Sequence, residues 1–335
     1  MIIPVKTLSG GYDIVLERGA LNHLADYLKL DRKVLIVTDS GVPEIYSKTA
    51  AKQCKEPFIV TIESGEPSKC FENYKKLLGI MVKEGFTRSD AVMAVGGGVV
   101  GDLSGFVAAS FMRGVDFYNI PTTILSQVDS SVGGKVAIDF EGYKNIVGAF
   151  YPPKAVIIDS ETLKTLPQRQ ISNGLSEAVK MSLTSDSELF SLFENEDIKT
   201  NIDRIIEASL KIKRYVVEED EKEAGLRKIL NFGHSLGHAI EVQNENLYHG
   251  ECVALGMLPM CNDKVRKRLI KVLEKLNLPT KVDFDIEKII EAMKHDKKMS
   301  GNNITVVYVE EVGSFKMRTV EFSILEKELK EVSGK

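Results

Sequence analysis

The sequence has few cysteines, no long apolar stretch and no excess of basic residues, and each absence excludes a class of protein. The four cysteines form no C-x-x-C pair, so we expect reduced thiols in a cytoplasmic protein and no disulfide framework. Apolar runs of about 18 residues do not occur, so we expect no membrane span, and we expect no secretory signal at the N-terminus. The net charge of −4 disfavours nucleic acid as a partner.

The first half of the sequence alternates short apolar runs with helical segments. Residues 33–39, 58–62 and 91–95 are apolar runs typical of buried strands. Residues 71–85 have the spacing of a helix between two such runs. Strands that alternate with helices predict a parallel sheet covered on both faces, which is a Rossmann-like α/β domain.

The second half of the sequence is almost continuously helical in pattern. Residues 201–221 and 262–277 are examples, and the alternating run 303–313 predicts a short strand or hairpin. We therefore predict an α/β domain over residues 1–165 and a mainly α-helical domain over residues 166–335. A cleft between the two domains is where we expect a ligand to bind.

Residues 92–111 have the pattern of a strand, a glycine-rich turn and a helix. Three consecutive glycines, residues 96–98, allow backbone N–H groups to approach an anion at the positive end of the helix. This pattern indicates a pyrophosphate site, although it is not G-x-G-x-x-G and a tight turn without a ligand explains the same glycines. Asp39, at the end of an early strand, fits either a ribose contact or a turn aspartate.

Three of the five histidines lie within one short segment. His234 and His238 are spaced i, i+4 on one helix face, and His249 follows at the start of another helical run. Glu177, flanked by apolar residues, is a candidate carboxylate ligand. Two histidines and one carboxylate form a common catalytic zinc site, whereas a histidine pair at this spacing, taken alone, is more often structural or at the surface.

Several cationic and amide side chains lie next to glycines or apolar residues, where a simple surface role fits poorly. Each one alone is compatible with a solvated position, but together they indicate a pocket for a phosphorylated, acidic substrate. They are Arg113, Lys135, Lys144, Asn145, Lys180, Lys213 and Arg227.

An ordered set of motifs resembles the 3-dehydroquinate synthase family of sugar-phosphate cyclases over nearly the whole chain. The motifs are GEPSK (65–69), GGGVVGD (96–102), FMRG (111–114), PTTILSQVDSSVGGK (121–135), KNIVGAF (144–150), TLP (165–167), GLSEAVK (174–180), LRKILNFGHSLGHAIE (226–241) and HGE (249–251). The resemblance implies a homodimer that binds NAD and a divalent metal, usually zinc, with cobalt as the alternative. Val136 and Asp139 depart from the family pattern, in which threonine and asparagine are common.

The resemblance also implies roles for individual residues. The implied metal ligands are Glu177, His234 and His249, and His238 is then a catalytic residue. The implied NAD-binding residues are Asp39, Gly65, Glu66, Lys69, Gly97, Gly98, Val99, Gly101, Asp102, Thr122, Thr123, Leu125, Asp129, Lys135, Lys144, Thr162, Thr165 and Leu166. The other implied catalytic or substrate-binding residues are Lys135, Asn145, Lys180, Lys213, Arg227, Asn231, Lys297 (or Lys298) and Arg113, which would act on the substrate phosphate of the neighbouring subunit.

The implied reaction converts 3-deoxy-D-arabino-heptulosonate 7-phosphate to 3-dehydroquinate and phosphate in the shikimate pathway, which leads to chorismate and the aromatic amino acids. In this family the steps are transient oxidation by NAD, phosphate elimination, reduction and intramolecular aldol closure, which makes the enzyme a lyase. Three alternatives stay open. They are another sugar-phosphate cyclase, a metal-dependent NAD alcohol dehydrogenase and a non-catalytic binding protein on the same scaffold.

Overall fold

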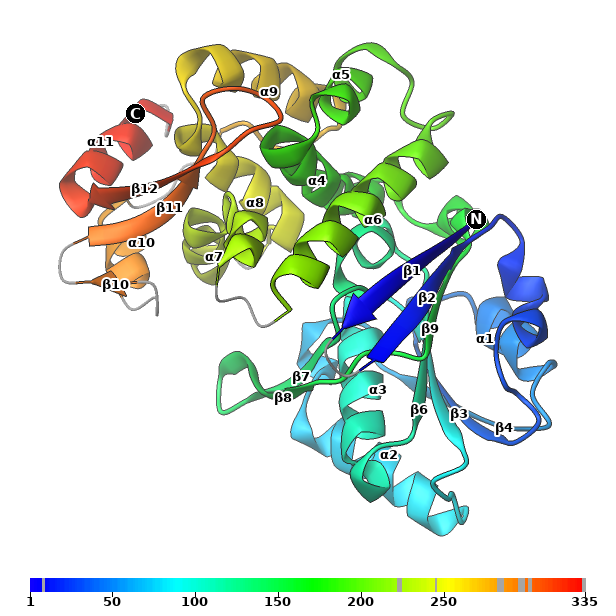
Figure 1. Ribbon diagram of the computed structural model, residues 1–335. Helices are drawn as coiled ribbons and strands as arrows, with labels where there is room; N and C mark the ends of the chain where they lie inside the picture. Colours follow the sequence, from blue (N-terminus) through cyan, green and yellow to red (C-terminus); the bar gives the residue numbers. More distant parts are fainter. Residues whose placement is uncertain are drawn as a thin grey trace. The chain divides into compact units, whose positions relative to one another are not determined.

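The computed structural model describes residues 1–7, 10–221, 225–244, 246–281, 286–294, 299–300 and 303–332. The chain divides into two compact units, an N-terminal unit over Met1–Pro167 and a C-terminal unit over Gln168–Lys335 (Figure 1). The sequence pattern placed the boundary after residue 165. Within the described part of the chain, every helix is too short or too polar to cross a lipid bilayer.

The N-terminal unit is built on a seven-stranded, mostly parallel sheet. Its spatial order is β1 (Ile2–Thr7), β2 (Gly10–Leu16), β9 (Ala155–Ile158), β6 (Asp116–Pro121), β5 (Ala91–Gly96), β3 (Lys33–Asp39) and β4 (Glu56–Ile62). All neighbours are parallel except β1 and β2, which form an antiparallel pair at one edge. The Rossmann-like fold is confirmed, but the apolar runs gave no sign of this antiparallel pair.

Helices and short helical turns connect these strands or follow the last of them. They are α1 (Glu44–Ala51), α2 (Phe71–Lys83), α3 (Gly98–Ser110), η1 (Ala20–Asn22), η2 (Leu24–Asp26), η3 (Glu66–Ser68), η4 (Phe111–Arg113), the π-helical η5 (Ser126–Ser130) and η6 (Ser160–Thr165). A separate antiparallel hairpin consists of β7 (Lys135–Phe140) and β8 (Tyr143–Phe150), with a register shift between Ile138 and Phe140. The bulge in this hairpin contains Asp139.

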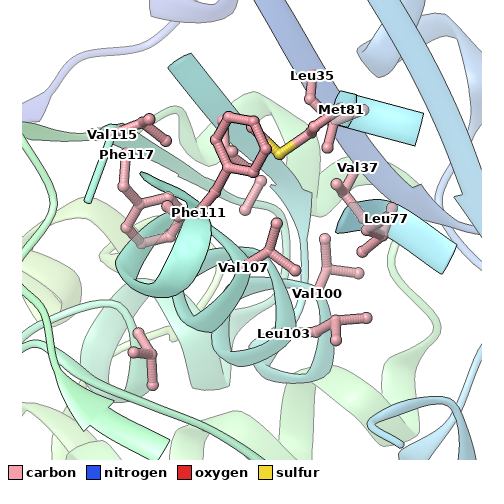
Figure 2. Close-up of a cluster of buried hydrophobic side chains, with 14 of the residues drawn as sticks. Leu35, Val37, Leu77, Met81, Val100, Leu103, Val107, Phe111, Val115 and Phe117 are labelled. Atoms are coloured by element: carbon pink, nitrogen blue, oxygen red, sulfur yellow. The ribbon is translucent and has the colours of Figure 1, made fainter. Parts of the chain in front are cut away.

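The sheet buries apolar side chains on both faces, because successive residues of a strand point to opposite sides. Leu35 and Val37 of β3 belong to the core cluster shown in Figure 2, where they pack with Val107 and other residues of α3. Val34 and Ile36 belong to a second cluster on the other face. This arrangement explains why β3 has an unbroken apolar run instead of an alternating one.

The C-terminal unit is mainly helical and also contains a small antiparallel sheet. Its helices are α4 (Gln168–Ser185), α5 (Ser187–Asn195), α6 (Ile202–Glu219), η7 (Leu226–Asn231), α7 (His234–Gln243), α8 (His249–Met257), η8 (Leu258–Met260), α9 (Asp263–Lys275), α10 (Ile286–Lys294) and α11 (Phe322–Val332). The sheet order is β10 (Met299–Ser300), β11 (Asn303–Tyr308) and β12 (Lys316–Glu321). The predicted strand in 303–313 is therefore present as β11.

Glycines allow α8 to approach its neighbours closely. A Cβ atom at Gly250 would overlap the carbonyl oxygen of Asn173 in α4, and one at Gly256 would overlap the carbonyl oxygen of Gly233, at the start of α7. Any larger residue at these two positions would push the helices apart. The close packing brings the first turns of α7 and α8 next to the middle of α4.

Candidate functional site

Three side chains from three helices meet in the C-terminal unit. Glu177 comes from the middle of α4, and His234 and His249 are the first residues of α7 and α8. The Glu177 Oε1 atom lies 3.6 Å from His234 Nε2 and 3.8 Å from His249 Nε2. One ligand atom from each residue lies within 4.8 Å of the others, which is a spacing that a single metal ion could bridge.

The chemistry of these three residues fits a divalent metal. Glu177 is 1% exposed, and its Oε1 atom has no hydrogen-bond partner among the described residues. The Nδ1 atoms face other acceptors, Phe232 O for His234 and Glu241 Oε2 for His249, each at 3.2 Å. An Nδ1–H tautomer on both rings leaves two Nε2 lone pairs beside a buried carboxylate oxygen, which is the ligand set of a catalytic zinc site.

The two imidazoles differ in electrostatic surroundings. Burial lowers the pKa of His234 well below its ordinary value, and the Lys180 ammonium lowers it further. Burial also acts to lower the pKa of His249, but the hydrogen bond to Glu241 and the Glu177 carboxylate outweigh it and leave that pKa raised. The His234 imidazole is therefore neutral at pH 7 and could offer a lone pair to a metal, whereas the Glu241 and Glu177 carboxylates favour the protonated form of His249.

The start of α8 is held in place by residues that the sequence analysis did not assign. Glu251 accepts a hydrogen bond from the backbone N–H of Tyr248 at 2.8 Å and two from Arg169 of α4, both at 2.7 Å. Asn173 accepts a hydrogen bond from the Gly250 N–H at 2.6 Å. The glutamate of the HGE motif therefore caps the helix that begins with His249, and its spacing three residues after Tyr248 was a usable signal.

His238 lies one turn after His234, with ring centroids 5.3 Å from His234 and 5.8 Å from His249. His238, Glu241 and His249 form a second group that could hold a metal ion. This group contains an exposed histidine and shares His249 with the first. The buried, unpartnered Glu177 oxygen favours the first group, because an unsatisfied buried carboxylate oxygen is costly.

Buried cations surround the same helices. Lys180 is 2% exposed and pairs with Glu177 Oε2, and Lys213 of α6 and Arg227 of η7 are also buried. Arg227 donates a hydrogen bond from Nη1 to the carbonyl oxygen of Glu221 at 2.6 Å, and Asn231 ends η7. α4 packs against both α6 and η7, so Lys213 and Arg227 lie on elements that contact the helix of Glu177. The predicted Lys297 and its alternative Lys298 lie outside the described residues.

In the N-terminal unit, the glycine-rich turn joins β5 to α3 as predicted. Gly97 precedes the first turn of α3, and a Cβ atom there would lie 3.2 Å from Thr123 Cγ2. A Cβ atom at Gly98 would lie 3.1 Å from Ser130 Oγ. The turn therefore has little space for side chains, and the N–H groups of a 13-residue helix begin there, which suits an anion.

Except for Lys135 and Lys144, the predicted NAD-binding residues lie at or after the carboxyl ends of the parallel strands. Asp39 ends β3; Gly65, Glu66 and Lys69 follow β4; Gly97, Gly98, Val99, Gly101 and Asp102 follow β5; Thr122, Thr123, Leu125 and Asp129 follow β6; and Thr162, Thr165 and Leu166 follow β9. The carboxyl ends of parallel strands lie on the same side of the sheet, and folds of this kind bind ligands there. Lys135 begins β7, and Lys144 and Asn145 lie exposed in β8.

The surroundings of Asp39 fit both a turn aspartate and a ribose contact. Its Oδ1 atom accepts a hydrogen bond from the Gly41 N–H at 2.8 Å, as a turn aspartate does. Burial raises the pKa of Asp39, against the opposing effect of the Gly41 and Val42 N–H groups. Its place beside the other strand ends also suits a ribose contact.

Lys69 is the centre of a charged cluster in the N-terminal unit. Its side chain is 5% exposed, and its Nζ lies 2.6 Å from Glu66, 3.4 Å from Asp102 and 3.8 Å from Asp139. Burial raises the pKa of Asp102 to about 6, although the Lys69 ammonium acts to lower it. Asp139 also accepts a hydrogen bond from the Asn145 N–H at 2.8 Å, so the cluster ties the hairpin to η3 and α3.

Comparison with solved structures supports the fold. The chain resembles 2-deoxy-scyllo-inosose synthase, crystallised with carbaglucose-6-phosphate, NAD+ and Co2+, with a TM-score of 0.89 and 24% identity over 99% of this chain and 100% of the other. It also resembles 2-epi-5-epi-valiolone synthase from Streptomyces hygroscopicus with NAD+ and Zn2+ bound, with a TM-score of 0.86 and 25% identity over 96% of both chains. A probable glycerol dehydrogenase from Sinorhizobium meliloti has a TM-score of 0.63 at 18% identity over 96% of both chains.

Relatives found by sequence have higher identity to this chain than these solved structures do. The chain is 40% identical to 3-dehydroquinate synthase of Enterococcus faecalis over 95% of both chains, and 44% identical to that of Acetivibrio thermocellus over 83% of both. Residues 59–173 match the family described as 3-dehydroquinate synthase N-terminal, and residues 174–299 match 3-dehydroquinate synthase C-terminal. The chain belongs to the 3-dehydroquinate synthase family.

Proposed function

We propose that this chain converts 3-deoxy-D-arabino-heptulosonate 7-phosphate to 3-dehydroquinate and phosphate, as a carbon–oxygen lyase that depends on NAD and a divalent metal. The observation that carries the proposal is the pairing on α4 of Glu177, which faces two imidazoles, with the buried Lys180 one turn later. A metal-competent carboxylate next to a buried cation suits a substrate with hydroxyl groups and negative charges.

The residues of the C-terminal unit would hold the metal and the substrate. Glu177, His234 and His249 would bind the ion, which when bound polarises the hydroxyl group that is oxidised. Lys180, Lys213 and Arg227 are buried cations and would fix the carboxylate and phosphate of the substrate. His238, one turn along α7 from a ligand, would move a proton at the substrate, and Asn231 would hydrogen-bond to it.

The residues of the N-terminal unit would hold NAD, which when bound takes up a hydride and later returns it. The N–H groups that follow Gly97 would bind its pyrophosphate, and Asp39 would bind a ribose. Lys69, Asp102 and Asp129 would orient the remainder of the cofactor. We also propose that the protein is a cytoplasmic homodimer in which Arg113 and Asn145 complete the substrate contacts.

The proposal is tested by incubating the purified protein with the heptulosonate phosphate, a catalytic amount of NAD and zinc. We expect phosphate and dehydroquinate to be released in equal amounts while NADH does not accumulate. Glu177→Ala serves as the inactive control. Stoichiometric NADH without phosphate release would favour an alcohol dehydrogenase instead, and turnover only of sugar phosphates that lack a carboxylate would favour another cyclase.

A further inference from the structure

The two ring nitrogens of His249 face carboxylates on opposite sides. Nε2 lies 3.8 Å from Glu177 Oε1, and Nδ1 lies 3.2 Å from Glu241 Oε2. A neutral imidazole carries one proton, and the hydrogen bond at one nitrogen decides which nitrogen is free to bind a metal. Glu241 lies on α7, about two helical turns after His234. The same helix thus supplies one candidate ligand and the partner of another.

We propose that Glu241 is a positioning residue that accepts the Nδ1–H of His249 and so keeps Nε2 directed toward the metal. The proposal rests on the metal site in the proposed function. A carboxylate behind a metal-bound histidine fixes the ring orientation and makes the bound nitrogen more basic. Glu241 itself would not bind the ion.

The ring orientation of His249 depends more on its Nδ1 partner than that of His234 does. The His234 side chain is 12% exposed and its Nδ1 faces the backbone carbonyl of Phe232, a rigid acceptor. The His249 side chain is 31% exposed, so packing restrains its ring less. Its Nδ1 partner is a side chain that is itself 20% exposed. Removing Glu241 should therefore free the ring of His249 to rotate while the other two ligands stay in place.

The alternative role for Glu241 is that of a ligand, together with His238 and His249. In that arrangement Glu241 would give up the hydrogen bond to Nδ1, and Glu177 Oε1 would keep no partner. A positioning carboxylate and a ligand carboxylate respond differently to substitution by glutamine. The glutamine oxygen can still accept the Nδ1–H, whereas a neutral amide is a poor replacement for a carboxylate ligand.

The test is a zinc titration of the metal-free protein against a chromophoric chelator, combined with the absorption spectrum of the Co2+-loaded protein. Glu241→Ala and Glu241→Met, neither of which offers an oxygen to accept the Nδ1–H hydrogen bond, should lose about 10–100-fold in zinc affinity. Glu241→Gln should recover most of it. All variants should bind one metal per chain with an unchanged cobalt spectrum, because the ligands are unchanged. Glu207→Ala, which removes a 28%-exposed carboxylate from α6, is the matched control and should bind zinc like the wild type.

Two results would overturn the proposal. One is wild-type zinc affinity in both Glu241→Ala and Glu241→Met. The other is a loss in Glu241→Gln as large as in Glu241→Met, with an altered cobalt spectrum, which would make Glu241 a ligand. Glu177→Ala separates this failure from that of the metal site, because retained zinc in Glu177→Ala contradicts the proposed site itself. Equal thermal unfolding of the metal-free proteins shows that the variants fold.

Discussion

At the scale of single residues, the three histidines of the C-terminal unit differ in what surrounds each ring. His234 is deeply placed and has a backbone acceptor at Nδ1, and His249 has a carboxylate there. His238 is exposed, although it lies on the same helix as His234. A catalytic metal must keep positions open for substrate, so a fourth protein ligand would crowd it. These differences favour His234 and His249 as ligands and leave His238 for proton transfer.

Alanine variants of the three histidines test this division of roles. His234→Ala and His249→Ala should purify with little metal and almost no activity, because each removes a ligand. His238→Ala should keep near-stoichiometric metal and lose roughly 10²–10⁴-fold in turnover, the usual worth of a general acid or base. Metal analysis of the folded variants decides the matter. Loss of metal in His238→Ala together with its retention in His249→Ala would assign the ion to the second group.

Asp102 provides a prediction on pH dependence. Its pKa is raised from an ordinary 3.8 to about 6, so the folded protein binds this proton more tightly than the unfolded chain does. The stability contributed by the protonated form is complete below about pH 4 and is lost as the pH rises through about 6. Relative to wild type, cofactor-free Asp102→Asn should therefore gain up to about 3 kcal/mol between pH 4 and pH 7.

Urea unfolding of both proteins at the two pH values measures this gain. Asp31→Asn, which removes an exposed carboxylate in the same unit, controls for the general loss of a negative charge. If the difference in unfolding free energy between wild type and Asp102→Asn is the same at both pH values, the Asp102 carboxyl does not titrate in this range.

Among the secondary-structure elements, sequence periodicity located the central strands β3, β4 and β5 and helices such as α2, but not how the strands pair. The run 33–39 coincides with β3, and the helix expected over 71–85 is α2, which ends at Lys83. The β7–β8 hairpin and the antiparallel β1–β2 pair were not foreseen, because pairing depends on contacts between distant residues. The role of Glu241 was hidden for the same reason, since its partner lies on another helix. The order of the motifs predicted the candidate site residues. The packing of α4, α7 and α8 explains why three of them, Glu177, His234 and His249, lie close together.

The glycine-rich turn between β5 and α3 has little room for a side chain, so a larger residue there tests its role. Gly97→Val should weaken NAD binding about tenfold or more, which is ~1.4 kcal/mol. A Cβ atom at Gly97 already lies 3.2 Å from Thr123, so the added methyl groups would crowd the N–H groups that follow. Zinc content should not change, because the metal ligands belong to the other unit. Gly79→Val on α2, where a Cβ atom meets nothing within 4 Å, is the matched control. Unchanged NAD affinity in folded Gly97→Val would exclude a phosphate role for the turn.

For the molecule as a whole, Arg113 is the residue that tests whether one chain contains a complete site. Met112 and Arg113 have φ angles of 49° and 69°, and both are exposed. Consecutive non-glycine residues in the left-handed region carry backbone strain, which clusters at ligand-binding positions. No described residue of the same chain forms an ion pair with Arg113 within 4.0 Å. These features suit a side chain that binds an anion, and we propose that this anion is the substrate phosphate in the site of a partner subunit.

Mixed dimers test this role. Arg113→Ala and Lys180→Ala should each be almost inactive alone, because each would lack one phosphate or carboxylate contact in every site. If Arg113 acts across the dimer, a mixed dimer has one site with both native residues and one with neither. Random exchange in an equal mixture should then restore about a quarter of the wild-type activity, since half of the dimers are mixed and half of their sites are complete. Exchange is verified by mass spectrometry of differently tagged subunits. If exchange is complete and activity stays at the level of the separate variants, Arg113 serves the site of its own chain.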